Sequence, residues 1–159
     1  MHKNILLLAL ALAFSVVPAL ADEPSERLTP QEIVALPAAD AGPGTSGVTD
    51  MRTTVLSGDP SRAGLYTIQI VIPPHTTINA LQHRYDRGAT VISGMWFIGC
   101  GAVRDEKSLK ALPAGSFYTE PAGAVHFAGT GELPATVQIT GFGPSDTVYV
   151  NAGDDSGQH

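Results

Sequence analysis

The stretch Gly115-Ser-Phe-Tyr-Thr-Glu-Pro-Ala-Gly-Ala-Val-His126 decides the fold of this chain. Glycine and proline are the residues that tight turns require, so Gly115 and the pair Pro121 and Gly123 place turns at both ends of a short strand. His126 then stands at the start of the next strand. The stretch predicts two short strands joined by a tight turn, with a histidine at a set position after it.

Short strands continue on both sides of this stretch. Residues 65–72 alternate in polarity and are rich in β-branched side chains, which is typical of a half-buried strand. Further strands are predicted near residues 53–56, 76–83, 89–92, 95–100, 116–120, 126, 135–140 and 147–150. Many short strands with glycine and proline turns and almost no helix predict an all-β sandwich or small barrel.

The first residues predict export. A short positive start is followed by an apolar run over residues 5–17 and by an A-x-A site that ends at Ala21. The run is shorter than the roughly 20 apolar residues that a membrane-spanning helix needs. We therefore expect a cleavable Sec-type signal peptide over residues 1–21, cleavage after Ala21, and a periplasmic or secreted protein.

The remaining chain divides into three parts. Residues 22–49 are predicted to be an N-terminal leader with one short helix, because Thr29 and Glu32 form a capping-box pattern. Residues 50–152 form the barrel, and residues 153–159 are expected to be a disordered tail. The one cysteine, Cys100, lies between glycines in an apolar strand and is predicted to be buried.

The composition limits the partners. The chain has 15 Asp and Glu against 9 Lys and Arg, for a formal net charge of −6, and no run of basic residues. An acidic domain of this kind is not suited to binding nucleic acid, and we expect no membrane binding after the signal is cleaved.

The stretch from Gly115 to His126 resembles the second signature motif of the cupin superfamily, G-x5-P-x-G-x2-H-x3-N. The match is complete except that Thr130 stands at the position of the asparagine. The resemblance covers roughly residues 50–152 and implies a jelly-roll β-barrel of the RmlC-like type, as in small secreted single-domain cupins. Cupins also commonly dimerise, so the resemblance is compatible with a homodimer.

The first cupin signature, G-x5-H-x-H-x3,4-E-x6-G, fits when its last glycine is placed at Gly94. This frame puts Arg87 at the position of the glutamate, His83 at the second histidine and Leu81 at the first. By resemblance, these side chains and His126 point into the barrel, where cupins bind one divalent metal ion. The metal site is therefore expected to be degenerate, with His83 and His126 as its remaining ligand-type residues.

Two histidines are too few for a catalytic zinc or non-haem iron site. Leu81 offers no lone pair, and the cation of Arg87 repels a divalent ion. His75 follows two prolines and is predicted to be a turn residue at the opposite end of the barrel. Asp86, in the loop before Arg87, is expected to form a turn, pair with an arginine or, less favoured, ligate a metal.

Three functions remain open from the sequence. The first is binding of a small polar or anionic molecule by Arg87, His83 and His126. The second is a metal-dependent cupin enzyme of the oxygenase, isomerase or lyase type, with one weakly held divalent ion on His83, His126 and an unseen third group. The third is a structural or interaction module with a vestigial pocket and no cofactor.

Overall fold

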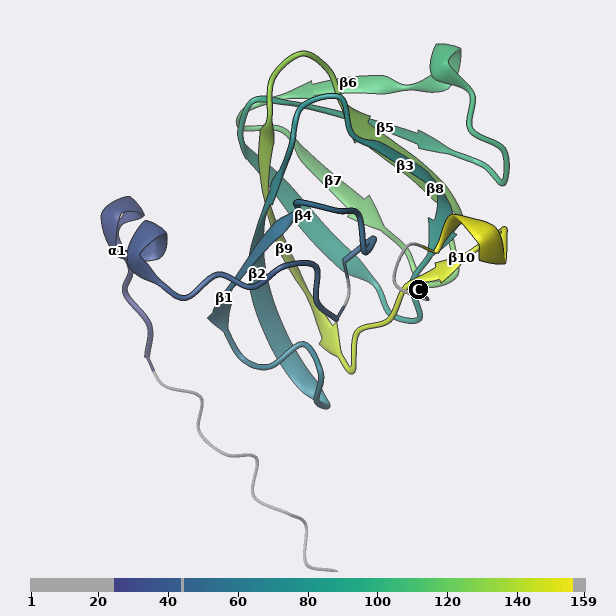
Figure 1. Ribbon diagram of the computed structural model, residues 1–159. Helices are drawn as coiled ribbons and strands as arrows, with labels where there is room; N and C mark the ends of the chain where they lie inside the picture. Colours follow the sequence, from purple (N-terminus) through teal and green to yellow (C-terminus); the bar gives the residue numbers. More distant parts are fainter. Residues whose placement is uncertain (1–24, 44, 156–159) are drawn as a thin grey trace, which may run out of the picture.

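The computed structural model describes residues 25–43 and 45–155 as two five-stranded antiparallel sheets packed face to face (Figure 1). The predicted all-β class is thereby confirmed. The signal peptide predicted over residues 1–21 lies outside the described residues. The elements are α1 (Pro30–Ala35), β1 (Arg52–Ser57), β2 (Gly64–Ile72), β3 (Thr77–Gln82), β4 (Arg87–Ser93), β5 (Met95–Cys100), η1 (Glu106–Ser108), β6 (Lys110–Pro113), β7 (Phe117–Glu120), β8 (His126–Thr130), β9 (Ala135–Gly143), β10 (Val148–Tyr149) and η2 (Ala152–Asp154).

The strand order carries the chain back and forth between the sheets. One sheet has the order β1-β2-β9-β4-β7 and the other β10-β3-β8-β5-β6. Strand β7 lies at the edge of the first sheet, beside β4, whereas β8 lies in the middle of the second sheet. The turn at Pro121 and Gly123 therefore takes the chain from one sheet to the other, and it brings the end of β7 and the start of β8 to the same part of the interior (Figure 1).

The core lies between the sheets and follows the period of two along each strand. On β2, Ile68 and Ile72 have no exposed surface, and their neighbours in sequence face outward or are half-buried. Val137 on β9 and Val91 on β4 are equally buried. The alternation that predicts the strands thus also selects the residues that fill the interior.

Gly94 shows why the frame of the first motif holds. It forms the turn between β4 and β5 with φ of 76°, a conformation that favours glycine. A Cβ at this position would lie 2.1 Å from the carbonyl oxygen of Pro134. The glycine used to place the motif is therefore required by both the backbone conformation and the close approach of another strand.

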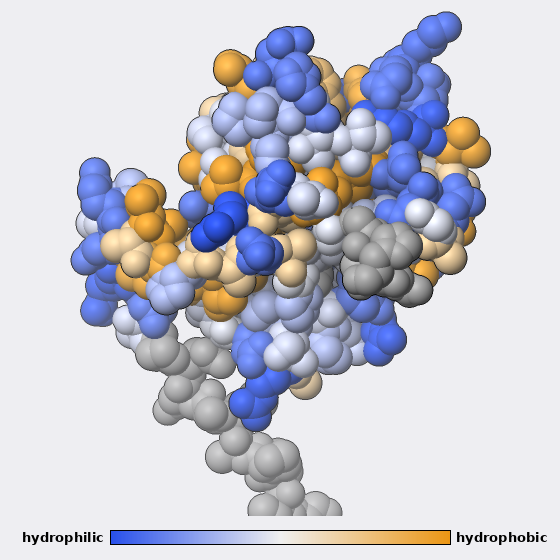
Figure 2. All heavy atoms as spheres, in the orientation of Figure 1, coloured by the Kyte–Doolittle hydropathy of each residue, from blue (hydrophilic) through white to orange (hydrophobic). Residues whose placement is uncertain are grey.

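Helix α1 begins with the predicted capping box of Thr29 and Glu32 and buries none of its residues. Figure 2 shows hydrophobic groups beside this helix and across the middle of the face viewed, with hydrophilic residues around them. No described helix is long and apolar enough to cross a membrane.

Residues 45–51 cover part of the barrel interior. Thr45, Ser46 and Met51 are all buried. The hydroxyl groups of Thr147 and Tyr149 donate hydrogen bonds to the carbonyl oxygens of Thr45 and Ser46. We call residues 45–51 the strap, because they tie the chain ahead of β1 to the segment around β10.

The last described residues are those of η2 and Asp155, and the side chain of Asn79 donates a hydrogen bond of 3.0 Å to Asp154. Residues 156–159 of the predicted tail lie outside the described part of the chain.

Candidate functional site: a buried polar cluster

Four polar side chains are buried together in one part of the interior, and we call them the polar cluster. They are His83, Arg87, Glu120 and His126, with exposed fractions of 3, 7, 5 and 6%. His83 follows β3, Arg87 begins β4, Glu120 ends β7 and His126 begins β8. The cluster therefore gathers residues from the ends of four strands that belong to both sheets.

Strand pairing explains why Arg87 and Glu120 meet. The two residues are directly opposite each other in the antiparallel pair of β4 and β7. Side chains of opposed residues point to the same face of a sheet. On β4 the inward residues after Arg87 are Ala89 and Val91, and on β7 Tyr118 lies on the same face as Glu120.

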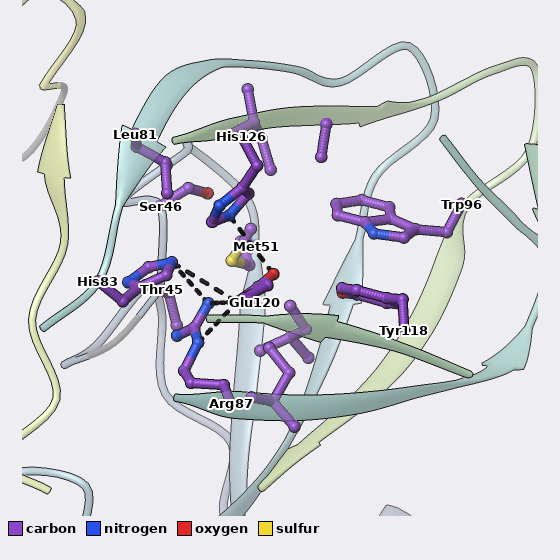
Figure 3. A pocket seen from close by; sticks show the side chains of 14 residues that line it. Thr45, Ser46, Met51, Leu81, His83, Arg87, Trp96, Tyr118, Glu120 and His126 are labelled. Carbon is purple, nitrogen blue, oxygen red and sulfur yellow. Dashed lines mark hydrogen bonds and ion pairs between the residues drawn. The ribbon is translucent and has the colours of Figure 1, made fainter. Parts of the chain in front are cut away.

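Arg87 connects the cluster (Figure 3). Its Nε donates a hydrogen bond of 2.7 Å to Oε2 of Glu120, and its Nη2 donates to the same oxygen. Nη2 also lies 2.7 Å from Nε2 of His83. The guanidinium is thus placed between the carboxylate and the imidazole, and it contacts both through one nitrogen.

Backbone carbonyls orient the two histidines. Nδ1 of His83 lies 2.6 Å from the carbonyl oxygen of Asp146, and Nδ1 of His126 lies 3.2 Å from that of Ala124. A carbonyl oxygen only accepts, so Nδ1 carries a proton in both rings, and Nε2 of His83 presents a lone pair. In His83 this lone pair accepts from Arg87.

The second imidazole faces the other carboxylate oxygen. Nε2 of His126 lies 3.4 Å from Oε1 of Glu120, and the two imidazole rings are 5.3 Å apart between centroids. Both Nε2 atoms therefore point toward the carboxylate, His83 from the end of β3 and His126 from the start of β8.

The electrostatic state of the cluster follows from burial and from Arg87. Burial first, and then the charge of Arg87, lower the pKa of His83 to about 4, so this imidazole is neutral at pH 7. Burial alone would raise the pKa of Glu120, but Arg87 and the two histidines bring it below its ordinary value. Burial would likewise lower the pKa of Arg87, but Glu120 raises it. At neutral pH the charges of Arg87 and Glu120 therefore cancel.

A cavity of about 30 Å³ adjoins the cluster. This is room for about two water molecules. The rest of its wall is largely apolar or aromatic and includes Leu81, Met51, Trp96 and Tyr118 (Figure 3). Burial and then the charge of Glu120 raise the pKa of Tyr118 well above its ordinary value, so its hydroxyl keeps its proton. The cavity is far smaller than the roughly 300–1,000 Å³ of an ordinary ligand pocket.

The positions taken from the two motifs meet in space. Leu81, His83, Arg87 and His126 all line the same cavity, so the frame of the first motif places its residues inward as expected. His75 is a turn residue with φ of 57°, and it lies near Glu132, outside the cluster.

Two residues behave differently from the expectations. Asp86 accepts a hydrogen bond of 2.7 Å from the backbone N–H of Ala122, and Arg87 pairs with Glu120 rather than with Asp86. The prediction that Cys100 is buried is wrong, because its thiol is exposed. Cys100 is the last residue of β5, and the exposed residues 101–103 follow it, so the core does not cover this end of the strand.

Sequence reasoning misses Glu120. It is the residue before Pro121, at the end of a strand that the sequence does predict. The available signal is the alternation on β7, which puts Glu120 two positions from Tyr118 and hence on the same face. Its partner is visible only once β7 is known to pair with β4.

Glu120 also changes the question of a metal ion. Ligand atoms of His83, Glu120 and His126 all lie within 4.8 Å of one another. Two imidazoles and one carboxylate are the ligand set of many non-haem iron sites. The types of donor therefore fit a divalent ion.

The surroundings do not fit it. Nη2 of Arg87 already contacts both His83 and Glu120, and its positive charge would lie beside the ion. Like charges at such distances in a buried site repel strongly. In the arrangement that the structure shows, the cluster does not accommodate a divalent ion.

Comparisons with known proteins support the fold. No protein-family model matches the chain, and no curated protein matches it. Solved structures do match. An RmlC-like cupin from Shewanella frigidimarina NCIMB 400 is 16% identical with a TM-score of 0.54, and the match covers 76% of this chain and 92% of that one.

Two further structures belong to enzymes. The polyketide cyclase RemF from Streptomyces resistomycificus is 14% identical with a TM-score of 0.61, over 81% of this chain and 89% of that one. A chain from the structures of the DMSP lyases RdDddP and RnDddQII is 18% identical with a TM-score of 0.51, over 62% of this chain and 51% of that one. The chain therefore has the cupin fold that the two motifs predict.

Proposed function

We propose that this protein is an exported cupin-fold protein that binds a small, uncharged polar molecule in its barrel without a metal ion. The observation that carries the proposal is a buried polar cluster in which the charges of Arg87 and Glu120 cancel, placed against an apolar and aromatic wall. Binding sites for small molecules combine these two features, since the apolar wall supplies affinity and a few polar groups fix orientation.

The charge balance selects the class of ligand. Arg87 and Glu120 neutralise each other, and His83 is neutral. An anion or a cation in this interior would add a buried charge without a partner, which is unfavourable. A polar molecule is therefore favoured over an anionic one. Oε1 of Glu120 can accept a hydrogen bond, and the protonated hydroxyl of Tyr118 can donate one.

The cavity implies that the strap moves when a ligand binds. Thr45, Ser46 and Met51 line the closed cavity together with the cluster. The hydrogen bonds from Thr147 and Tyr149 to the strap are made by side chains, so the strap can be released without breaking a sheet. We expect faster amide hydrogen exchange over residues 45–51 than in β2 or β9.

The test is a thermal-unfolding screen of the mature protein with phenols, cyclic ketones, sugars and matched carboxylates. An uncharged binder should raise the melting temperature. The variant His126→Asn should lose this increase, and His75→Asn, a histidine outside the cluster, should keep it. An increase with carboxylates alone would contradict the uncharged ligand, and no increase with any compound would favour a module with a vestigial pocket.

Export is tested separately by expressing the full chain in a Gram-negative host. We expect the protein in the periplasm or the medium, with the mass of a chain that begins at Asp22. A cytoplasmic protein that retains Met1 would contradict export and leave the binding proposal standing.

A metal-dependent enzyme is the second candidate. It is favoured by Glu120, because this carboxylate supplies the third metal ligand that His83 and His126 alone do not provide. Two of the solved structures that share the fold are named as a cyclase and a lyase. This candidate requires Arg87 to leave Glu120. Elemental analysis of protein purified without added metal decides it, because an enzyme of this kind should hold close to one ion per chain.

A further inference from the structure

We propose that Arg87 is a built-in replacement for a metal ion, and that its guanidinium closes a latent divalent-ion site formed by His83, Glu120 and His126. The proposal concerns only the polar cluster and does not depend on which molecule the barrel binds. Its starting point is that a positively charged nitrogen lies between two atoms that would otherwise be metal ligands (Figure 3).

The ligand atoms all lie within 4.8 Å of one another, which is somewhat wider than in a formed coordination site. Nε2 of His83 lies 3.7 Å from Oε2 of Glu120, and Nε2 of His126 lies 3.4 Å from Oε1. Two ligands each about 2.1 Å from one ion are about 3.0 Å apart at a right angle and about 3.4 Å apart at a tetrahedral angle. Small side-chain adjustments would therefore bring all three groups onto one ion.

The histidines are oriented as metal ligands are. A ligating histidine usually donates its second ring N–H to a backbone carbonyl or carboxylate, which fixes the tautomer and the direction of the lone pair. His83 does this with Asp146 and His126 with Ala124. These contacts involve backbone atoms and do not require Arg87, so they should persist without it.

The carboxylate of the site comes from the strand next to the one that the first motif assigns. In the frame of the first motif the acidic residue belongs at position 87, on β4. Here position 87 is arginine, and the carboxylate comes from Glu120, which is its direct partner on β7. The acidic and the basic residue thus occupy opposed positions on neighbouring strands, and the guanidinium of Arg87 neutralises the carboxylate of Glu120.

Charge makes the two cations exclude each other. With Arg87 in place the guanidinium and Glu120 are neutral together, and a divalent ion would leave two uncompensated positive charges in the barrel. Without Arg87 the same ion would face one carboxylate and two neutral imidazoles. Leu81 contributes no ligand, so the site would have three protein ligands and an open position.

The experiment compares the wild type with Arg87→Met, in which an apolar chain of similar length replaces the guanidinium. Zn²⁺ and Co²⁺ are titrated into metal-free protein by calorimetry, and Co²⁺ is also followed by visible absorption. Arg87→Met should bind one ion per chain about 100-fold or more tighter than the wild type, because a nearby positive charge is removed. Arg87→Lys keeps the charge and serves as the matched control without a gain.

Two double variants locate the ion. Arg87→Met combined with His126→Gln or with Glu120→Gln should lose most of the gained affinity. If Arg87→Met does not fold alone, it is refolded from denaturant with and without Zn²⁺, and Zn²⁺ should restore the folded state. The proposal is overturned if the wild type holds a stoichiometric ion on these residues, if folded Arg87→Met binds no tighter than the wild type, or if Zn²⁺ fails to restore an unfolded variant.

Discussion

The barrel interior has two buried regions that are stabilised by different interactions. In the apolar region, Ile68, Val91 and Val137 have no exposed surface and contribute stability by leaving water. In the polar cluster, Arg87 and Glu120 are almost as deeply buried and must first lose their hydration. The apolar region therefore tolerates small changes, whereas the polar cluster is stable only while each buried charge keeps its partner.

Removing one partner of the cluster should have the largest effect. Glu120→Ala leaves the Arg87 cation buried without its carboxylate, and we expect the free energy of unfolding to fall by about 3–5 kcal/mol. This is a large part of the roughly 5–15 kcal/mol that stabilises an ordinary domain. Urea denaturation followed by circular dichroism measures the change.

The double variant Arg87→Met with Glu120→Leu is the control for this prediction. It removes both charges and keeps the volume, so its stability should return close to that of the wild type or exceed it. A double variant as unstable as Glu120→Ala alone would show that the pair has a packing role that the charges do not explain.

Acid should weaken the polar cluster and leave the apolar region unaffected. The pKa of His83 is about 4 in the folded protein against an ordinary 6.5, so the unfolded chain binds the proton first. Its contribution is fully present above pH 6.5 and is lost as the pH falls toward 4. The lowered pKa of Glu120 adds a further loss below its ordinary 4.5.

The protonation of His83 should remove about 3 kcal/mol from the free energy of unfolding, because lowering a pKa by one corresponds to about 1.4 kcal/mol. Urea denaturation at several pH values measures this loss. The variant His83→Gln should show a smaller slope between pH 6.5 and 4.5, where Glu120 contributes little. An equal slope in the variant would assign the acid sensitivity to other groups.

A change of one methyl group in the apolar region should have a smaller effect. Ile68→Val removes one buried methyl group from β2, and we expect a loss of about 1 kcal/mol. The variant should keep the pH dependence of the wild type, since it touches no charged group. Urea denaturation at about pH 7 and about pH 5 tests both statements. If the loss of stability in Ile68→Val differed between the two pH values, the apolar region and the polar cluster would not be independent.

The same contrast explains what the sequence can predict. The fold and the inward positions of Leu81, His83, Arg87 and His126 follow from two motifs and from the period of two along a strand. Both signals are local, and Gly94 is required where the frame places it. Prediction succeeds where short stretches determine the direction of a side chain.

The partners of those side chains are not local. Glu120 is separated from Arg87 by 33 positions and meets it only through the pairing of β7 with β4. The sequence predicts most of the strap only as the end of the N-terminal leader, and its contacts to Thr147 and Tyr149 span more than a hundred positions. A glutamate at a strand end usually faces water, so its burial depends on a partner that no neighbouring residue reveals.

The outer face of the first sheet provides the baseline for both regions. Thr67 and Thr140 are opposed on β2 and β9, and their hydroxyl oxygens are 2.9 Å apart. In Thr67→Val the β-branched shape is kept and water can replace the lost hydroxyl, so we expect a change below about 0.5 kcal/mol. Urea denaturation should place this variant within error of the wild type at every pH. A loss as large as that of Ile68→Val would mean that this face is covered in solution, as it would be in a homodimer, and sedimentation at several protein concentrations would then show the association.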